Sequence, residues 1–335
     1  MAETTSPSLS IVVATHRRPD HLEHLLDAMR EQTVSPADFE IVIIDNDNQP
    51  SPAVQALSTS RQYQALHVRY VHHAQLGLSN ARNRGIKEAA AALIAFLDDD
   101  VIPPPEWVRQ VLCVRENIHA DVYGGPYTPF YSSTPPRWFK EKYASLDYGD
   151  QAFWLPANKY LAGANMIWDK NLLLRLGGFS NNFGYVGNKK KYGDDSELCQ
   201  RATEAGVGIW YDPALTLRHH RETERMTVRW QLNAIVRHSQ MKAQLLLRET
   251  RISDTRAPFR QSLSIFKKFF LQSIKLLAVL CLIPFRNRNE YPYLENYLVE
   301  AVGGELRQVS LTFEMLRGLL SHSKASQTGH ELKVG

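Results

Sequence analysis

Residues 95–100, Ala95-Phe96-Leu97-Asp98-Asp99-Asp100, join an apolar run to three adjacent carboxylates. The run that ends at Leu97 begins at Ala89, and this short apolar pattern predicts a buried strand. The acids would then lie at the carboxyl edge of a sheet, where open α/β sheets bind their ligands. Adjacent carboxylates repel one another, so a divalent cation is expected among them, and hard oxygen ligands suit Mg²⁺ or Mn²⁺ shared with substrate phosphates. The stretch indicates a metal–diphosphate site, while a solvated acidic turn is the simpler alternative.

The segments before this stretch alternate between strand and helix patterns. Short apolar and β-branched runs predict strands at residues 9–14, 39–44 and 68–71. Asp20 is expected to cap a helix with one apolar stripe, and a second helix is expected over residues 81–92. This alternation is typical of an α/β fold with a mostly parallel sheet flanked by helices.

Composition and missing motifs exclude several classes of protein. The 335 residues are 44% hydrophobic with a formal net charge of +4, a globular composition that gives no indication of nucleic acid binding. Cys113, Cys199 and Cys281 are too few and too far apart for a disulfide framework, and no secretory signal is recognised, so a cytoplasmic location is expected. Neither GxGxxG after the first strand nor GxxxxGK[ST] occurs, which argues against a dehydrogenase and a P-loop enzyme.

Three segments after residue 126 are candidates for ligand contacts. Residues 127–154 are rich in aromatic residues and predict a binding loop, or rings that cover the sheet. Trp138 and Trp154 are the candidates there for stacking on a ligand. At Gly163-Ala164-Asn165 the backbone can approach a ligand closely. Residues 184–193 read as a mobile basic loop that either closes over a bound ligand or is simply solvated.

Acids and histidines recur further along the chain. Asp194 and Asp195 precede a helix expected over residues 196–205, a position that the helix dipole favours for structural reasons alone. Their place on a Gly-containing loop also suggests a function. His219 and His220 end a predicted strand, and metal binding and a structural role are equally supported for them.

Long helices are predicted beyond residue 226. The uninterrupted apolar part of the most hydrophobic one, residues 276–285, is too short for the ~20 residues that a bilayer crossing needs. Basic residues on both sides favour a helix lying in the membrane surface, and packing on the catalytic domain is the alternative. We therefore expect a catalytic domain over residues 1–225, a helical region over 226–320 and a flexible tail over 321–335.

An ordered set of motifs resembles the family 2 glycosyltransferases of bacteria. These motifs are LSIVVATHRRPDHL, IVIIDNDNQPS, GLSNARNRGI, AFLDDDVIPPPEWV, GANM, GGF, YGDDSEL and DPALTLRHH. The segment DNDNQPS, with Gly125-Pro126 and Pro136-Arg137-Trp138, is similar to the glucosyltransferases that assemble exopolysaccharide repeat units of the succinoglycan type.

The resemblance implies a GT-A fold, a nucleotide-diphospho-sugar donor and inversion at the anomeric carbon. It implies that Asp195 is the catalytic base, and that Asp100 and His219 bind Mn²⁺ or Mg²⁺, with His220 as the alternative ligand. The nucleotide contacts that it implies are Thr15, Asp45, Asn46, Arg82, Asp98 and Asp99. The expected acceptor contacts are Trp138, Asn165 and Asp194, the last of which replaces the usual Glu.

The expected function is transfer of a hexose from a UDP-sugar to a glycan or lipid-linked saccharide, with peripheral membrane contact left open. A nucleotidyltransferase is one alternative, but it predicts a Gly/Lys-rich phosphate loop after the first strand, which residues 14–20 are not. An inactive carbohydrate- or nucleotide-binding protein is another, and the presence of both Asp100 and Asp195 argues against it.

Overall fold

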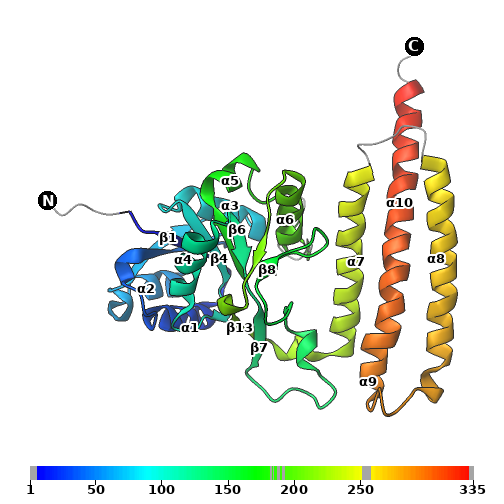
Figure 1. Cartoon of the computed structure of the whole chain (residues 1–335), viewed down its shortest axis with the longest axis horizontal. Coiled ribbons are helices and arrows are strands. Elements are labelled where there is room, and N and C mark those ends of the chain that lie inside the picture. Colours follow the sequence, from blue (N-terminus) through cyan, green and yellow to red (C-terminus); the bar gives the residue numbers. More distant parts are fainter. Residues whose placement is uncertain are drawn as a thin grey trace. The chain divides into compact units, whose positions relative to one another are not determined.

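The computed structural model describes residues 6–250 and 258–331, apart from residues 182, 184, 187, 188, 191 and 192. The chain divides into two compact units (Figure 1). The first unit consists of Met1–Ser132 and Glu141–Arg221, and the second of Ser133–Lys140 and Glu222–Gly335. The segment of residues 133–140 therefore belongs to the second unit, although both of its neighbours in sequence belong to the first.

Among the described residues, eight strands of the first unit pair into one sheet in the order β3-β2-β1-β4-β9-β6-β12-β8. These strands are β1 (Leu9–Thr15), β2 (Phe39–Asp45), β3 (His67–His72), β4 (Leu93–Asp98), β6 (Val122–Gly124), β8 (Phe153–Trp154), β9 (Asn165–Asp169) and β12 (Trp210–Tyr211). The run from β3 to β4 is parallel, whereas β9 is antiparallel to both β4 and β6. The predicted strands of the N-terminal half are present, and the sheet is mostly parallel.

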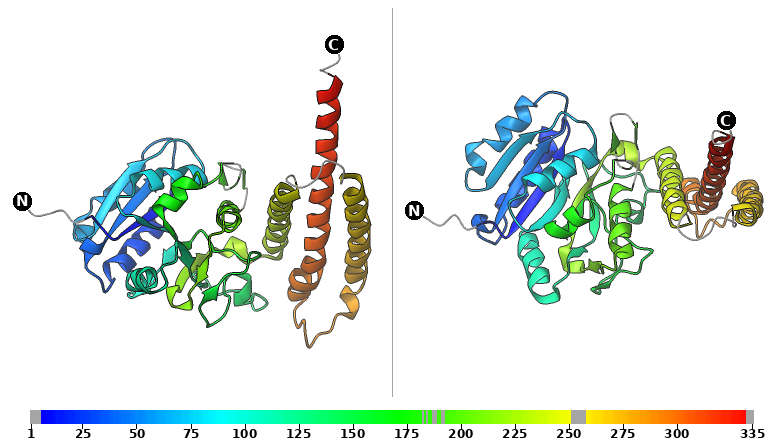
Figure 2. Two further views of the ribbon diagram at one scale, coloured as in Figure 1. Left: turned by 45° about the horizontal axis from the view of Figure 1, so that its top comes forward. Right: turned by 90° about the horizontal axis from the view of Figure 1, so that it is seen from above.

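Helices cover both faces of this sheet (Figures 1 and 2). One face carries α1 (Pro19–Arg30), α2 (Pro52–Ser58) and α4 (Trp107–Ile118), and the other carries α3 (Leu78–Glu88), α5 (Lys170–Arg175) and α6 (Asp194–Glu204). Strand β1 shows why two cores form: Ile11 and Val13 belong to the first and Val12 to the second, because successive side chains point to opposite faces. Both sides of the central strands are therefore buried.

Smaller elements complete the first unit. Strands β5 (Val101–Ile102), β13 (Leu217–Arg221) and β7 (Tyr127–Tyr131) form a second sheet, and β10 (Tyr185–Val186) pairs with β11 (Lys189–Lys190). The short turns of helix are η1 (Pro36–Asp38), η2 (Arg61–Tyr63), η3 (Glu141–Tyr143) and η4 (Pro213–Leu215). The proposed closure of the loop from Gly184 to Gly193 falls partly on residues outside those that the structure describes.

Among the helix starts and ends that differ from the sequence prediction, three have a clear local cause. Asp20 is not the N-cap of α1, because Arg18 holds that position and Pro19 is the first helical residue. Helix α3 ends at Glu88 rather than at residue 92, since Ala89 is extended and the N–H of Ala90 donates to Glu40. Helix α6 begins two residues early, at Asp194, after Gly193 in a left-handed conformation (φ 93°) that favours glycine.

The second unit is helical. Its elements are η5 (Thr223–Met226), α7 (Val228–Thr250), α8 (Pro258–Cys281), η6 (Ile283–Phe285), α9 (Leu294–Tyr297), the π-helical η7 (Leu298–Val302) and α10 (Gly303–Glu331). Helix α10 packs against both α7 and α8. The segment of residues 133–140 is attached here, because the Trp138 carbonyl accepts from Asn296 and Lys140 pairs with Glu300 at 2.6 Å. Within the described part of the chain, none of the helices combines the length and the hydropathy that a bilayer crossing requires.

Candidate functional site

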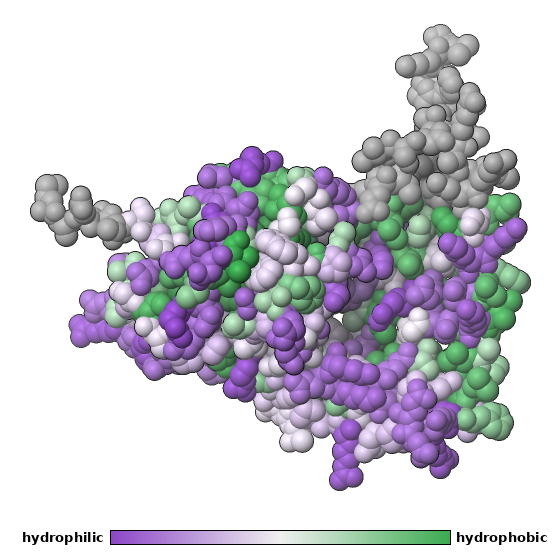
Figure 3. Space-filling model, in the orientation of Figure 1, coloured by the Kyte–Doolittle hydropathy of each residue, from purple (hydrophilic) through white to green (hydrophobic). Residues whose placement is uncertain are grey.

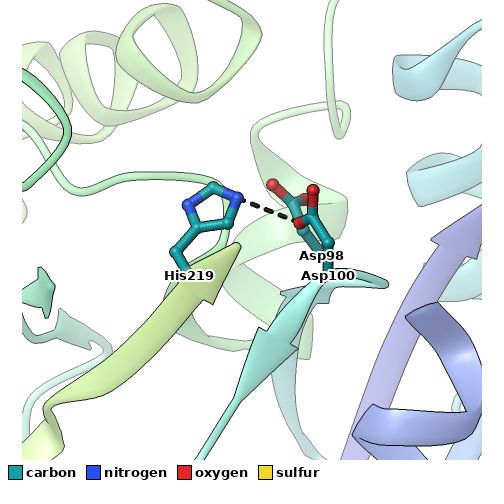
Figure 4. Close-up of side chains that lie close together, drawn as sticks. All are labelled: Asp98, Asp100 and His219. Atoms are coloured by element: carbon teal, nitrogen blue, oxygen red, sulfur yellow. Dashed lines mark ion pairs between the residues drawn. The ribbon is translucent and has the colours of Figure 1, made fainter. Parts of the chain in front are cut away.

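The end of β4 and the strand β13 bring two acids and a histidine together. Asp98 is the last residue of β4, and Asp100 lies in the turn that leads to β5. Strand β13 pairs with β5 so that His219 faces Val101, which places the imidazole beside Asp100. One possible ligand atom from each of Asp98, Asp100 and His219 lies within 4.8 Å of the others (Figure 4). The Nε2 atom of His219 is 2.9 Å from Oδ1 of Asp100.

These three side chains fit a divalent cation. Two carboxylates and an imidazole are ligands that Mn²⁺ accepts, and they approach from different elements, as in a preformed site. His220 points elsewhere, because its ring centroid lies 4.8 Å from that of His21 and 5.2 Å from that of Phe130. Of the two predicted histidines, the structure places His219 with the acids.

Arg18 provides positive charge beside the acidic turn. Its Nη1 atom donates to Oδ2 of Asp100 at 3.2 Å and lies 3.5 Å from Oδ1 of Asp99. Asp99 is buried and accepts a hydrogen bond from the Thr15 hydroxyl at 2.7 Å. Burial, together with the charge of Asp100, raises the pKa of Asp99 to about 7. Thr15 and Asp99 thus bond to each other across β1 and β4, and their contact with a nucleotide stays a prediction.

The end of β2 supplies one buried oxygen that has no hydrogen-bond partner among the described residues. Oδ2 of Asp45 accepts from the N–H of Ser51 and from the hydroxyl of Tyr70, both at 2.7 Å, whereas its Oδ1 accepts from neither. A buried carboxylate oxygen without a donor is costly, so a ligand N–H would be bound favourably here. Neighbouring Asn46 uses its amide on the backbone of residues 73–77, which gives it a structural role.

Arg82 on α3 connects the acids of β4 with those of α6. Its guanidinium donates to Oδ2 of Asp194 at 2.7 Å and to Oδ1 of Asp98 at 2.9 Å. It also donates to the carbonyl of Gly163 at 3.1 Å, and a Cβ atom on Gly163 would lie 2.5 Å from Arg82. Burial alone would lower the pKa of Arg82, but the charges of Asp194, Asp98 and Asp195 outweigh it and raise that pKa. A permanently charged arginine therefore joins Asp98 and Asp194, which are far apart in sequence. We call these two ion pairs the Arg82 link.

The two acids at the start of α6 have different surroundings. Asp194 is buried against Arg82, and burial raises its pKa to about 6, with Arg82 opposing and Asp195 adding to the shift. Asp195 is half-buried, and its Oδ2 accepts from the N–H of Gly163 at 2.9 Å while its Oδ1 accepts from the N–H of Ser196 at 2.7 Å. These two bonds hold the Asp195 carboxylate against Gly163, whose carbonyl accepts a hydrogen bond from Arg82.

The residues predicted to contact the acceptor have different surroundings. Asn165 is completely buried, and its amide donates to the carbonyls of Pro126 and Leu215, so its side chain holds strands together rather than facing a ligand. Trp138 belongs to the second unit. Trp154 in β8 is 51% exposed, and its ring lies 5.1 Å from that of Trp210.

Tyr127 is a site residue that the sequence did not indicate. Its ring meets that of His219 edge to face, with centroids 5.0 Å apart. Burial raises its pKa, Arg221 opposes the shift, and the charges of Asp195 and Asp98 add to it. Its place follows from the pairing of β7 with β13, in which Tyr127 faces Leu217, and no local pattern reveals that register.

Comparison with known proteins gives one family and several relatives. A profile described as "Glycosyl transferase family 2" matches residues 10–177. Glycosyltransferase AglE of Haloferax volcanii is 23% identical over 208 residues, which are 62% of this chain and 65% of AglE. Succinoglycan biosynthesis protein ExoM of Rhizobium meliloti is 30% identical over 134 residues, 39% of this chain and 42% of ExoM. The aligned part spans less than two thirds of either relative.

A solved structure shares the fold. The mannosyltransferase PcManGT from Pyrobaculum calidifontis, in complex with GDP-Man and Mn²⁺, superposes with a TM-score of 0.54 at 16% sequence identity. The superposition covers 99% of this chain and 82% of that one.

Proposed function

Since the chain belongs to glycosyl transferase family 2, we propose that it transfers a hexose from a nucleoside-diphosphate sugar to a saccharide acceptor with inversion at the anomeric carbon. The observation that carries this proposal is the Arg82 link, which holds the acidic end of β4 next to Asp194 and Asp195. The residues assigned to the reaction all lie in the first unit, which we take as the catalytic part.

The chemistry needs one base and one site for the leaving diphosphate. The acceptor hydroxyl oxygen bonds to the anomeric carbon, the bond from that carbon to the diphosphate oxygen breaks, and its electron pair leaves with the diphosphate. Asp195 takes the hydroxyl proton. Because no carboxylate nucleophile takes part, a single displacement inverts the configuration, as in inverting glycosidases.

Asp98, Asp100 and His219 would hold a divalent cation, which when bound supplies Lewis-acid stabilisation of the departing charge. Arg18 adds fixed positive charge beside the same acids. Arg82 keeps Asp194 ionised and paired, so that Asp195 is left as the half-exposed carboxylate of the pair.

For the donor we propose a UDP-sugar, with Oδ1 of Asp45 accepting the ring N–H of the base. Guanine also carries a ring N–H, and PcManGT is described in complex with GDP-Man, so both nucleotides belong in the test. For the acceptor we propose a glycan or lipid-linked saccharide of cell-surface polysaccharide synthesis. Its support is the similarity to ExoM, which is named for succinoglycan biosynthesis.

The test is a screen of UDP- and GDP-sugars with Mn²⁺, following nucleoside diphosphate release and the mass of the glycosylated acceptor. Wild-type protein should release diphosphate only with its own donor and acceptor. Asp195→Asn should lower the transfer rate by about 100-fold or more, because a general base contributes that much, while nucleotide binding persists. The matched control is Asp150→Asn, an exposed acid outside the site.

Three results would overturn the proposal. Full transfer by the Asp195→Asn variant would show that Asp195 is not the general base. Release of pyrophosphate from a nucleoside triphosphate would indicate a nucleotidyltransferase instead. Absence of turnover with every donor, with nucleotide still bound, would indicate a binding protein.

A further inference from the structure

Helix α8 turns a hydrophobic face to the solvent. The exposed large apolar side chains of α8 and the residues directly after it are Leu263, Phe266, Phe270, Leu271, Ile274, Leu277, Leu280, Leu282 and Phe285. Their exposed fractions run from 39% for Leu280 to 81% for Phe285. Figure 3 shows hydrophobic residues along the right-hand edge of this view, where Figure 1 places α8. Contiguous exposed apolar surface of this kind marks a site of interaction.

Helix α8 turns a strongly apolar side to the solvent, whereas a helix on the surface of a globular protein normally turns its apolar side to the core. At about 100° per residue, positions 263, 266, 270, 274 and 277 share one side of the helix. The opposite side, with Phe269, Gln272 and Leu276, is less exposed, and the Phe269 ring lies 5.9 Å from that of Phe313 on α10. A polar glutamine thus lies on the protein side, while Phe266 and Phe270 face outward. We call the exposed side the apolar face of α8.

The charged residues of α8 and of the segment directly after it are all positive. No Asp or Glu occurs from residue 258 to residue 289. The exposed lysines Lys267, Lys268 and Lys275 lie on α8, and Arg288 follows it. A second copy of α8 placed against the first would bring like charges together, whereas an anionic surface would be attracted. The complementary partner is therefore apolar in its interior and negative at its surface.

We propose that the apolar face of α8 lies in the surface of an anionic lipid bilayer, with the apolar side chains among the acyl chains and the lysines at the phosphate headgroups. A helix of 24 residues is about 36 Å long and lies along the surface, in agreement with the absence of a described helix suited to crossing. Each lysine near an anionic leaflet adds to the attraction, which salt weakens.

The test is co-sedimentation of the full chain with phosphatidylcholine vesicles that contain or lack phosphatidylglycerol. The protein should sediment with the anionic vesicles, less at high salt, and at least tenfold more weakly with the neutral ones. The double variant Phe270→Asp with Leu277→Asp should lower vesicle affinity at least tenfold. Because both side chains are exposed, its thermal unfolding should match that of the wild type.

Two further variants sharpen the experiment. Leu174→Asp changes an equally exposed leucine (56%) on α5 of the first unit and should leave vesicle binding unchanged. Lys267→Gln with Lys268→Gln should reduce binding to anionic vesicles and remove most of its salt dependence. Vesicle binding needs no sugar donor, so its result is independent of the proposed transferase activity.

Three outcomes would overturn the proposal. The first is an absence of sedimentation with any vesicle, and the second is equal binding by the double variant and the wild type. The third is a dimer in solution that the double variant dissociates while vesicles fail to bind, because the apolar face would then be covered by a second copy of this chain.

Discussion

At the scale of single residues, the buried arginine of α3 determines how the site is held. Replacing Arg82 by methionine would leave Asp194 buried without its cation, so we expect the free energy of unfolding to fall by about 3–5 kcal/mol. The control is Arg84→Met, two residues along the same helix. Arg84 forms a partly exposed pair with Glu88, and its loss should cost less than about 1 kcal/mol. Equal losses in denaturant unfolding would show that Arg82 is not the link.

The two adjacent histidines separate metal binding from packing. His219→Ala should raise the Mn²⁺ concentration needed for half-maximal activity at least tenfold, because even indirect partners of a metal ligand have effects of that size. His220→Ala should leave the metal requirement unchanged, since its ring contacts His21 and Phe130 instead. A metal titration of both variants, followed by nucleoside diphosphate release, makes the comparison. The reverse pattern would transfer the ligand role to His220.

Part of the site could be predicted from single residues and part could not. The acids of residues 98–100 follow from an apolar run that ends in carboxylates, and that pattern is local. Tyr127 contacts His219 because of the register in which β7 pairs with β13, and the sequence of neither strand alone determines that register. Asn46 and Asn165 have side chains that could bind a ligand, but buried backbone groups of distant segments use them.

At the scale of elements, the contact of α3 with β1 depends on a glycine. A Cβ atom on Gly85 would lie 2.1 Å from Cγ1 of Val12, inside the core. Gly85→Ala should therefore lower the free energy of unfolding by about 1–3 kcal/mol and reduce activity, because α3 also carries Arg82. Gly304→Ala on α10 meets nothing within 4 Å and should instead stabilise its helix by about 0.5–1 kcal/mol. Denaturant unfolding of both variants checks the sign, and a neutral Gly85→Ala would contradict this account.

The elements that the sequence predicted well are those buried on both faces. β1, β2 and β4 are mostly apolar runs, so their type follows from their own residues, and the predicted GT-A fold class is confirmed. β1 and β2 begin where the sequence predicts, whereas β4 begins at Leu93 rather than at Ala89. The antiparallel insertion of β9 between β4 and β6 could not be predicted, because it depends on pairing between distant segments. The aromatic stretch 127–154 likewise divides among β7, β8 and a segment of the other unit.

At the scale of the whole molecule, ligand binding should act on one unit only. Mn²⁺ with the correct nucleoside diphosphate, at about 100 times its dissociation constant, should stabilise the first unit by about 2.7 kcal/mol. Hydrogen exchange followed peptide by peptide should slow in β1, β4 and α6 and stay unchanged in α7, α8 and α10. Asp100→Asn should remove the part of the effect that depends on Mn²⁺. Equal slowing in both units would show that they are thermodynamically coupled.

The placement of residues 133–140 has a consequence for how such a chain can be inherited. These residues contact Asn296 and Glu300 in the helical unit, yet they are encoded between the two stretches of the first unit. A single genetic crossover near residue 222 would replace the helices of the second unit but keep the original residues 133–140, which contact those helices. Replacement of the helical part in one piece is therefore disfavoured, and the two coding stretches are expected to diverge in step among descendants.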